Sequence, residues 1–417
     1  MKQTFRSKFS KWIALFLPGI FLLGLNIGTG SVTTMAKAGA DYGMSLLWTI
    51  IASCLTTFFM INLYGKYTLV TGETALQAFR KHIHPGVGIF FIIALTIGVC
   101  GSVMGVMGIV ADICYEWSKS AVDGGISPIY FAVSFILMVY YIFWNGKTQF
   151  FERALAVIVA IMSASFLLNF FIMMPPPMEI IKGLIPNVPK SLDTDKSPFL
   201  IIASLVGTTV FSGLFIIRTT LVKEAGWKIT DLKKQRTDAV VSVTLMFVIS
   251  ASIMAAAAGT LYAEGVGLTN ASQMIGLLEP LAGRFAASVF AVGIISAGVS
   301  SQFPNILMLP WLLCDYNNSK RNMTLPKYRV MVLLISLLGL VVPVFNAQPV
   351  FVMVVSQVFN AVILPVTVLS ILYLSNRVDL MGKYKNKRIE NVFLALILLF
   401  SIYTSYVGIT GVIQLIN

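Results

Sequence analysis

Eleven apolar segments, each about as long as a bilayer-spanning helix, take up most of this 417-residue chain. A membrane-spanning helix needs about 20 predominantly apolar residues to cross a hydrocarbon core that is about 30 Å thick. Hydrophobic residues make up 57% of the chain and charged residues 11%, and the mean hydropathy is +0.86. The chain is therefore predicted to be an integral membrane protein rather than a soluble globular one. The expected spans are 13–38, 43–65, 86–114, 127–144, 152–175, 198–222, 239–262, 284–312, 327–346, 349–376 and 391–415.

Basic residues gather on one side of these predicted spans. Cytoplasmic loops of membrane proteins retain an excess of Lys and Arg. With a cytoplasmic N-terminus, 24 of the 30 Lys and Arg residues lie in cytoplasmic segments, and an odd number of spans places the C-terminus outside. The basic N-terminal tail has no Ala-x-Ala cleavage pattern and is not expected to be a signal peptide. The net charge of +13 thus fits contact with an anionic inner leaflet and requires no nucleic-acid partner.

Small and hydroxylated residues interrupt the first span over Asn26–Thr34, which reads NIGTGSVTT. Lipid offers the backbone no hydrogen-bonding partners, so an opened helix is tolerated only where it lines a protein cavity or water. Glycine adopts the backbone conformations of such an opening more readily than other residues. Many secondary transporters build their substrate sites from interrupted helices. The alternative is a face of small residues packed against a neighbouring helix, which this stretch alone does not exclude.

A second interruption occurs in the sixth span, where Gly207–Gly213 reads GTTVFSG. Because the two interrupted helices are five spans apart, the second crosses the membrane in the opposite direction. Matching broken helices in two inverted halves are the best sequence indication of a binding site at the midplane. We therefore expect an all-α membrane protein built from two inverted five-helix repeats, residues 1–175 and 176–376. Residues 377–417 would add a basic cytoplasmic loop and a peripheral eleventh helix.

Three further parts of the chain match the pattern of a known family. Ala38–Gly43 followed by Leu46–Trp48 is similar to that family's junction of the first and second spans. Gly65–Leu76 is similar to its next cytoplasmic loop, and Ser356–Val358 with Leu364–Pro365 is similar to its tenth span. Together these segments resemble the Nramp-type divalent metal transporters, over most of the chain. The resemblance implies the leucine-transporter fold, alternating access and, in most members, import of manganese or iron with protons.

The residues that carry that family's chemistry are missing at the matching positions. The first-span motif Asp-Pro-Gly-Asn is matched by Gly28–Ser31, and the sixth-span Met-Pro-His by Phe211–Gly213. The third-span Asp and Glu, which serve proton movement in the family, fall near Val99 and Ser102. Sites selective for manganese or iron use carboxylate, carbonyl, imidazole or sulfur ligands. Dehydrated manganese or iron is therefore expected to bind poorly, because neutral dipoles do not offset the cost of removing the water shell.

The candidate substrate-binding residues come from the two interruptions and from the tenth span. Gln357 and Asn360 are three residues apart and share a helix face, where they either line the path or bond to another helix. Ser300–Gln302 and Asn305 of the eighth span present the same two alternatives. No metal ligand is assigned. The candidates are Asn26, Gly28, Thr29, Gly30, Ser31, Thr208, Thr209, Phe211, Ser212, Gly213, Gln357 and Asn360.

Two kinds of solute fit such a neutral site. Magnesium holds its water shell tightly and can be recognised through it, although one or two carboxylates are usual in its sites. An anionic or neutral polar solute would instead use the half-helices that begin near Ser31 and Ser212, because their N-termini carry partial positive charge. Arg218 is a further candidate, unless it marks the cytoplasmic end of the sixth span, paired with Glu224 or extended to the surface.

Secondary transport is the function that these patterns favour. The chain has neither a catalytic constellation nor a glycine-rich phosphate loop, so we expect no enzyme, no ATP-driven pump and no cofactor. We predict a Nramp-related transporter of the inner or plasma membrane that moves an inorganic cation, with hydrated Mg²⁺ as a specific candidate. Its expected partners are a small ion or polar solute and membrane lipid. A membrane sensor that keeps the fold without transport is the alternative class.

Overall fold

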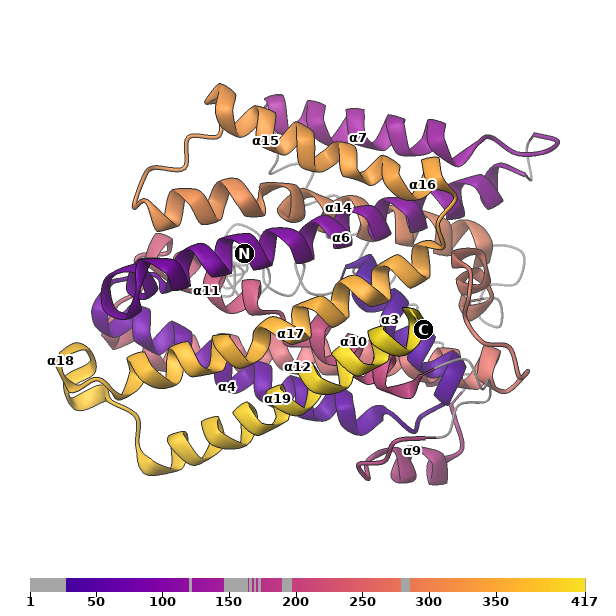
Figure 1. The fold of residues 1–417 in the computed structure, drawn as a ribbon. Helices are drawn as coiled ribbons and strands as arrows, with labels where there is room; N and C mark the ends of the chain where they lie inside the picture. Colours follow the sequence, from indigo (N-terminus) through magenta and orange to yellow (C-terminus); the bar gives the residue numbers. More distant parts are fainter. Residues whose placement is uncertain are drawn as a thin grey trace, which may run out of the picture.

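The computed structural model describes residues 28–119, 122–145, 174–189, 197–278 and 286–416, together with a few positions between 164 and 171, and all regular structure in them is helical. The α-helices are α3 (Thr29–Tyr42), α4 (Leu47–Thr71), α5 (Ala75–Ala78), α6 (Pro85–Ser118), α7 (Pro128–Asn145), α9 (Pro177–Gly183), α10 (Pro198–Thr209), α11 (Ser212–Glu224), α12 (Leu232–Ala257), α14 (Ala286–Tyr316), α15 (Pro326–Leu337), α16 (Val341–Phe345), α17 (Pro349–Asn376), α18 (Val378–Met381) and α19 (Arg388–Ile416). Short π or 3₁₀ segments are η1 (Phe79–Ile83), η2 (Ile229–Asp231), η3 (Ala258–Tyr262), η4 (Ala271–Leu278), η6 (Leu338–Leu340) and η7 (Gly382–Tyr384). Figure 1 shows the long helices side by side in one bundle, with α18 at one end and α9 at the other.

Nine helical stretches in the described residues are long and apolar enough to cross a membrane. Agreement with the sequence is closest for the tenth span, which is predicted at 349–376 and observed as α17. The seventh span differs most from its predicted start. It is expected to begin at residue 239, but the helical stretch begins at Ile229, because two polar turns precede its apolar part. The first and fifth expected spans, 13–38 and 152–175, lie partly or largely outside the described residues. The chain is thus a multi-pass membrane protein.

The sixth span is interrupted where the sequence predicts it. α10 ends at Thr209 and α11 begins at Ser212, and two non-helical residues, Val210 and Phe211, connect them. In the first span, Gly28 has an extended backbone and α3 begins at the following residue. Only the part of the first span from Gly28 onward belongs to the described residues. Two helix N-termini, those of α3 and α11, therefore start inside the predicted membrane region.

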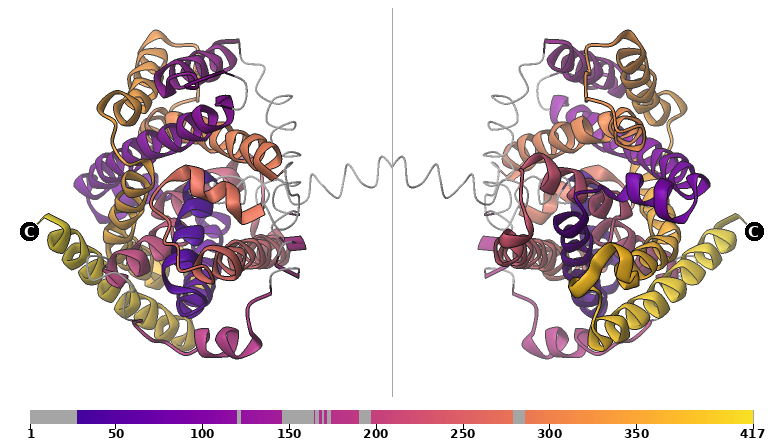
Figure 2. Two further views of the ribbon diagram at one scale, coloured as in Figure 1. Left: turned by 90° about the vertical axis from the view of Figure 1, so that its right-hand side faces the viewer. Right: turned by 90° about the vertical axis from the view of Figure 1, so that its left-hand side faces the viewer.

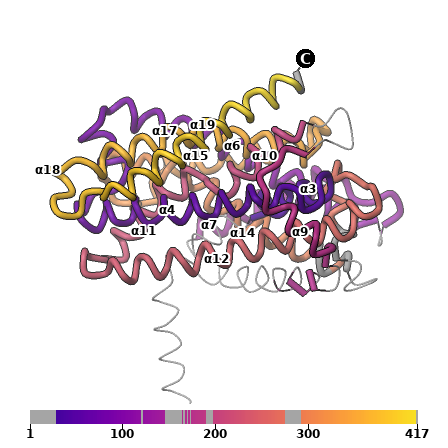
Figure 3. The backbone as a smooth tube through the Cα atoms, turned by 90° about the horizontal axis from the view of Figure 1, so that it is seen from below, coloured from indigo at the N-terminus to yellow at the C-terminus, as the bar shows by residue number. Residues whose placement is uncertain are grey.

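Helix α3 lies in the interior of the bundle. All of its residues except Lys37 are buried, and it contacts α10, α12, α14 and α17. Figure 2 views the bundle from two sides and shows the indigo α3 surrounded by other helices. The approach to α12 requires glycine at Gly39, where a Cβ atom would lie 2.2 Å from the carbonyl oxygen of Met254. α12 also runs along α4, as the view in Figure 3 shows. Small residues at such contacts let helix backbones pack closely in a membrane.

The end of α10 is held between α17 and α4. A Cβ atom at Gly207 would lie 1.7 Å from the carbonyl oxygen of Gln357 in α17, which leaves no room for a side chain. On the α4 side, the hydroxyl of Thr57 donates a hydrogen bond of 2.8 Å to the carbonyl oxygen of Thr209. These contacts fix the position of the residues at which the sixth span opens.

Arg218 is completely buried in α11. Its guanidinium forms an ion pair of 2.5 Å with Asp238 of α12 and donates a hydrogen bond to the side-chain oxygen of Gln235. Both predicted alternatives for its charge are wrong. Extension to the surface is excluded because Arg218 has no exposed surface, and Glu224 pairs with Arg321 at 3.2 Å instead. Arg218 does not line the cavity described below and instead joins α11 to α12.

Candidate functional site

A cavity lies between the interruptions of the first and sixth spans. Its volume, taken as the space that the centres of water molecules can occupy, is about 50 Å³. Its walls come from α3, α6, α10, α14 and α17 and from the link between α10 and α11. The lining residues are Gly28, Gly30, Ser31, Val99, Ser102, Val106, Thr208, Phe211, Ser301, Asn305, Met353, Gln357 and Asn360. Seven of the twelve residues predicted from sequence therefore meet at one place.

A direct hydrogen bond joins the two interruptions. The hydroxyl oxygens of Ser31 and Thr208 are 3.0 Å apart, and either can donate. Glycine is needed at the first interruption, because a Cβ atom on Gly28 would lie 2.5 Å from the Cβ atom of Ser301 in α14. The opened first span thus touches α10 and α14 at once.

Helix α17 brings two amides and a thioether to the cavity. Asn360 Nδ2 donates to Gln357 Oε1 at 3.1 Å, and Gln357 Nε2 donates to the sulfur of Met353 at 3.4 Å. Sequence reasoning found no thioether in the sixth span and missed this one in the tenth. The spacing of four residues between Met353 and Gln357 places both on one helix face and would have identified it. The hydroxyls of Ser102 in α6 and Ser356 in α17 are 3.2 Å apart, which ties these two walls together.

Four of the predicted residues that the structure describes do not line the cavity. Asn26 lies outside the described residues. The hydroxyl of Ser212 faces α17, where it accepts a hydrogen bond of 2.7 Å from Thr367. Gly213 makes room for the ring of Phe211, since a Cβ atom there would lie 2.4 Å from a ring carbon. The four residues are Thr29, Thr209, Ser212 and Gly213.

The described walls of the cavity carry no ionisable side chain. They present hydroxyl, amide, thioether and apolar groups. In the part of the chain that the structure describes, no three His, Cys, Asp or Glu side chains lie together as a metal site would require. The two positions expected to match the proton-handling carboxylates, Val99 and Ser102, are part of the wall. Such a site can hydrogen-bond a hydrated ion or a polar solute, and the N-termini of α3 and α11 add partial positive charge.

The charged residues of α3 lie at its opposite end, away from this cavity. Lys37 and Asp41 form an ion pair of 2.8 Å. Lys37 also donates to the carbonyl oxygen of Leu268 at 2.7 Å, and the amide of Leu268 donates to Asp41 at 3.1 Å. These bonds tie the loop before η4 to α3. A second cavity lies beside this pair, between the first turns of α10 and α17, and the two opposite charges balance each other in its wall.

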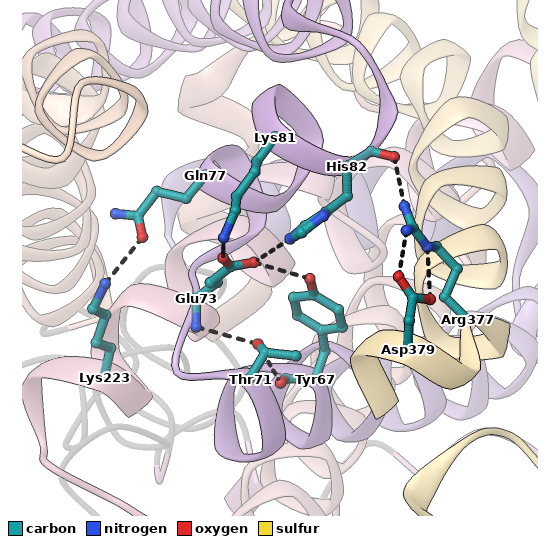
Figure 4. A network of polar contacts seen from close by, with 9 residues as sticks. All are labelled: Tyr67, Thr71, Glu73, Gln77, Lys81, His82, Lys223, Arg377 and Asp379. Carbon is teal, nitrogen blue, oxygen red and sulfur yellow. Dashed lines mark hydrogen bonds and ion pairs between the residues drawn. The ribbon is translucent and has the colours of Figure 1, made fainter. Parts of the chain in front are cut away.

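A polar network joins α4, η1 and α18 at the end of the bundle that is predicted to be cytoplasmic (Figure 4). The carboxylate of Glu73 lies 2.7 Å from Lys81 Nζ and 2.7 Å from His82 Nε2. The main-chain carbonyl of His82 accepts a hydrogen bond of 3.2 Å from Arg377, which also pairs with Asp379. Burial by itself would raise the pKa of Glu73, but the hydrogen bonds and charges of Lys81 and His82 outweigh burial and lower that pKa.

Substitution Glu73→Gln is expected to lower the melting temperature at neutral pH, because it removes the negative charge that Lys81 and His82 contact. Since the pKa of Glu73 in the fold lies below its ordinary value of 4.5, the ionised carboxylate stabilises the fold fully above that value. The contribution disappears as the pH falls through the lowered pKa. Thermal unfolding in detergent at about pH 7 and about pH 4 should show a difference between the two proteins that shrinks in acid. The exposed Glu264→Gln is the control, and an undiminished difference at the lower pH would contradict the assignment.

Comparisons with known proteins find similar proteins over nearly the whole length of this chain. A family model described as natural resistance-associated macrophage protein-like matches residues 19–410. The divalent metal cation transporter MntH of Chromohalobacter salexigens is 22% identical, with 96% of this chain and 93% of that protein covered. A solved manganese transporter of Eremococcus coleocola has a TM-score of 0.75 at 19% identity, covering 98% and 88% of the two chains. The inward-facing conformation of Mhp1 has a TM-score of 0.60 at 15% identity, covering 96% and 89%. These likenesses confirm the predicted all-α, leucine-transporter-like fold.

Proposed function

Since this chain belongs to the natural resistance-associated macrophage protein-like (Nramp) family, we propose that it is a secondary transporter that moves a divalent cation by alternating access. The family consists of membrane transporters, so the chain is not an enzyme. The name of its relative MntH, a divalent metal cation transporter, supports this substrate class. Among divalent cations, the one that fits the cavity best is Mg²⁺ with most of its water retained.

The neutral polar lining of the cavity is the observation that carries this proposal. Stripping water from a divalent cation costs far more than hydroxyls and amides return, so the ion must cross with most of its shell. Mg²⁺ binds water octahedrally at about 2.1 Å and dehydrates reluctantly, and the centres of its six waters lie on a sphere of roughly 40 Å³. The cavity offers about 50 Å³ to water centres. Its hydroxyls and amides would then bond to the waters rather than to the metal.

The distribution of basic residues supports an orientation in the inner or plasma membrane. We infer from it that the N-terminus and the network around Glu73 lie on the cytoplasmic side and the C-terminus outside. We infer that residues 1–175 and 176–376 act as inverted repeats that rock about the cavity, with 377–417 at the periphery. The seven predicted residues that line the cavity would contact the substrate or its water.

A small anionic or neutral polar solute is the second candidate substrate. α3 and α11 both begin at the cavity, and neither has an acidic residue in its first turn. Their partial positive charges are therefore not compensated by their own side chains and favour a carboxylate-bearing solute. The two candidates differ in the sign of charge that they would carry across the membrane.

Uptake into proteoliposomes tests the proposal. The purified protein should take up Mg²⁺ in a saturable manner, and Mn²⁺ should compete only weakly. Gly28→Leu, whose side chain collides with Ser301, should abolish uptake while the protein still shows cooperative thermal unfolding. Saturable uptake of bicarbonate or a small carboxylate, without Mg²⁺ uptake, would replace the proposal with the second candidate. Mg²⁺ binding without any flux would indicate a sensor, and micromolar Mn²⁺ binding by calorimetry would overturn the hydrated-ion argument.

A further inference from the structure

Asn305 of α14 is the polar residue of the cavity wall that keeps accessible surface. Thirteen residues line the cavity; Asn305 and Phe211 are partly exposed, and the other eleven are buried. The three residues on either side of Asn305 in α14 are all buried, so this part of the helix lies inside the bundle. Ser301, four residues earlier on the same helix face, also lines the cavity. The accessible surface of Asn305 therefore faces the cavity.

The other polar side chains of the wall already bond to protein groups. The hydroxyls of Ser31 and Thr208 pair with each other at 3.0 Å, and the hydroxyl of Ser301 donates to the carbonyl oxygen of Gly298 at 3.1 Å. The remaining hydroxyl and the two amides of α6 and α17 are paired in the same way; they belong to Ser102, Gln357 and Asn360.

The amide of Asn305 differs from these groups, because its side chain has no hydrogen-bond partner among the residues that the structure describes. An amide has two donor hydrogens and an oxygen with two lone pairs. Since no protein group holds either end of this amide, rotation of the side chain can turn the oxygen or the NH₂ group to the cavity. Asn305 thus keeps its full hydrogen-bonding capacity for what enters.

We propose that Asn305 is the side chain through which the cavity recognises its solute, and that its oxygen accepts a hydrogen bond from the water shell of a divalent cation. Water around a cation directs its O–H groups outward and needs acceptors in the wall. A hydrogen bond made through such a water is nearly as favourable as a direct one. The inference rests on the proposed function and deepens it, because it names the residue that the hydrated ion contacts.

Two substitutions of Asn305 should change the apparent KM for Mg²⁺ uptake in opposite directions. Asn305→Asp keeps the shape and adds a negative charge, so KM should fall roughly tenfold or more in a site of low dielectric. Asn305→Leu keeps a similar size and removes both hydrogen-bonding groups, so KM should rise roughly five- to tenfold. Unchanged KM values for both variants would overturn the assignment.

Asn317→Asp is the matched control for the added charge. Asn317 directly follows α14, is exposed and does not line the cavity. Water and salt screen a charge at such a position, so the KM for Mg²⁺ should stay within about twofold of the wild-type value. A fall in KM equal to that of Asn305→Asp would show that the charge acts from a distance and would contradict contact at Asn305.

Thiol labelling tests the same contact without measuring transport. In a protein whose four cysteines are replaced by alanine, Asn305→Cys should react with a small methanethiosulfonate reagent, and Mg²⁺ should slow the reaction. Asn360→Cys is the control on another wall, because Asn360 is 3% exposed and should react little. Absence of labelling at position 305, or labelling that Mg²⁺ does not slow, would overturn the proposal.

The wild-type protein in the same vesicles separates this inference from the proposed function. Mg²⁺ uptake by the wild type, combined with unchanged KM values in both Asn305 variants, would leave the proposed function in place and reject only the role of Asn305. Absence of uptake, combined with labelling that Mg²⁺ slows, would reject transport and keep Asn305 as a binding residue. Thermal unfolding of each variant shows which of them are folded.

Discussion

Arg218→Met is expected to lower the free energy of unfolding by about 3–5 kcal/mol, the typical cost of breaking a buried ion pair from one side. The substitution leaves Asp238 as a buried negative charge and takes the donor from the side-chain oxygen of Gln235. Both groups have lost their water and have no solvent to replace the missing partner, because Asp238 and Gln235 are each 1% exposed. Thermal or denaturant unfolding of the purified protein in detergent measures the loss.

The double variant Arg218→Met with Asp238→Leu identifies the cause of that loss. It removes both charges, and apolar residues can replace a buried pair at little cost, so most of the lost stability should return. Breaking the exposed pair between Lys119 and Glu116, which are 2.8 Å apart, by Lys119→Ala should leave stability almost unchanged. A double variant that is as unstable as Arg218→Met would show that the charge of Asp238 is not responsible.

Gly207→Ala should produce the second large effect, a loss of both stability and transport. The added Cβ atom would lie 1.7 Å from the carbonyl oxygen of Gln357. Over-packing of a core typically costs about 1–3 kcal/mol, and here no change of side-chain rotamer relieves the collision, because the opposing atom belongs to the backbone. α10 and α17 must separate, and the wall that carries Gln357 moves with them. Uptake should therefore fail even in molecules that remain folded.

Gly86→Ala provides the comparison for Gly207→Ala. It adds the same methyl group at the start of α6, where the nearest atom is in the ring of His84 at 3.0 Å and can move aside. Unfolding and uptake of this variant should resemble those of the wild type. Similar behaviour of the two alanine variants would show that the contact between α10 and α17 tolerates a methyl group and is looser than described.

Much of the fold could be predicted because lipid simplifies the physics. A chain in hydrocarbon must satisfy its own backbone hydrogen bonds, so a long apolar segment is a helix and its ends are readable from composition. The tenth span, 349–376, was predicted to the residue. The opening of the sixth span is also predictable, because small polar residues gather over Gly207–Gly213 in an apolar segment and match those of the first span. These features depend on local sequence and on the surrounding lipid alone.

The side-chain directions at the site were harder to predict. Within an opened segment the period of 3.6 residues no longer holds, so adjacent residues such as Phe211 and Ser212 turn to different neighbours. One alternative from the sequence paired Arg218 with Glu224, the nearer carboxylate along the chain, whereas its partner is Asp238. That choice depends on how α11 and α12 are rotated against each other. The contribution of Met353 arises in the same way, from a helix brought to the cavity by tertiary packing.

The contact between Ser31 and Thr208 gives the centre of the molecule an adjustable polarity. Each hydroxyl can donate or accept, and the roles exchange when two light hydrogen atoms rotate while the oxygens stay 3.0 Å apart. This pair of hydroxyls can therefore accept a hydrogen bond from one bound solute and donate one to another without moving a helix. No proton enters or leaves the protein in this exchange. The pair thus responds to the dipole of what is bound and not to the acidity of the medium.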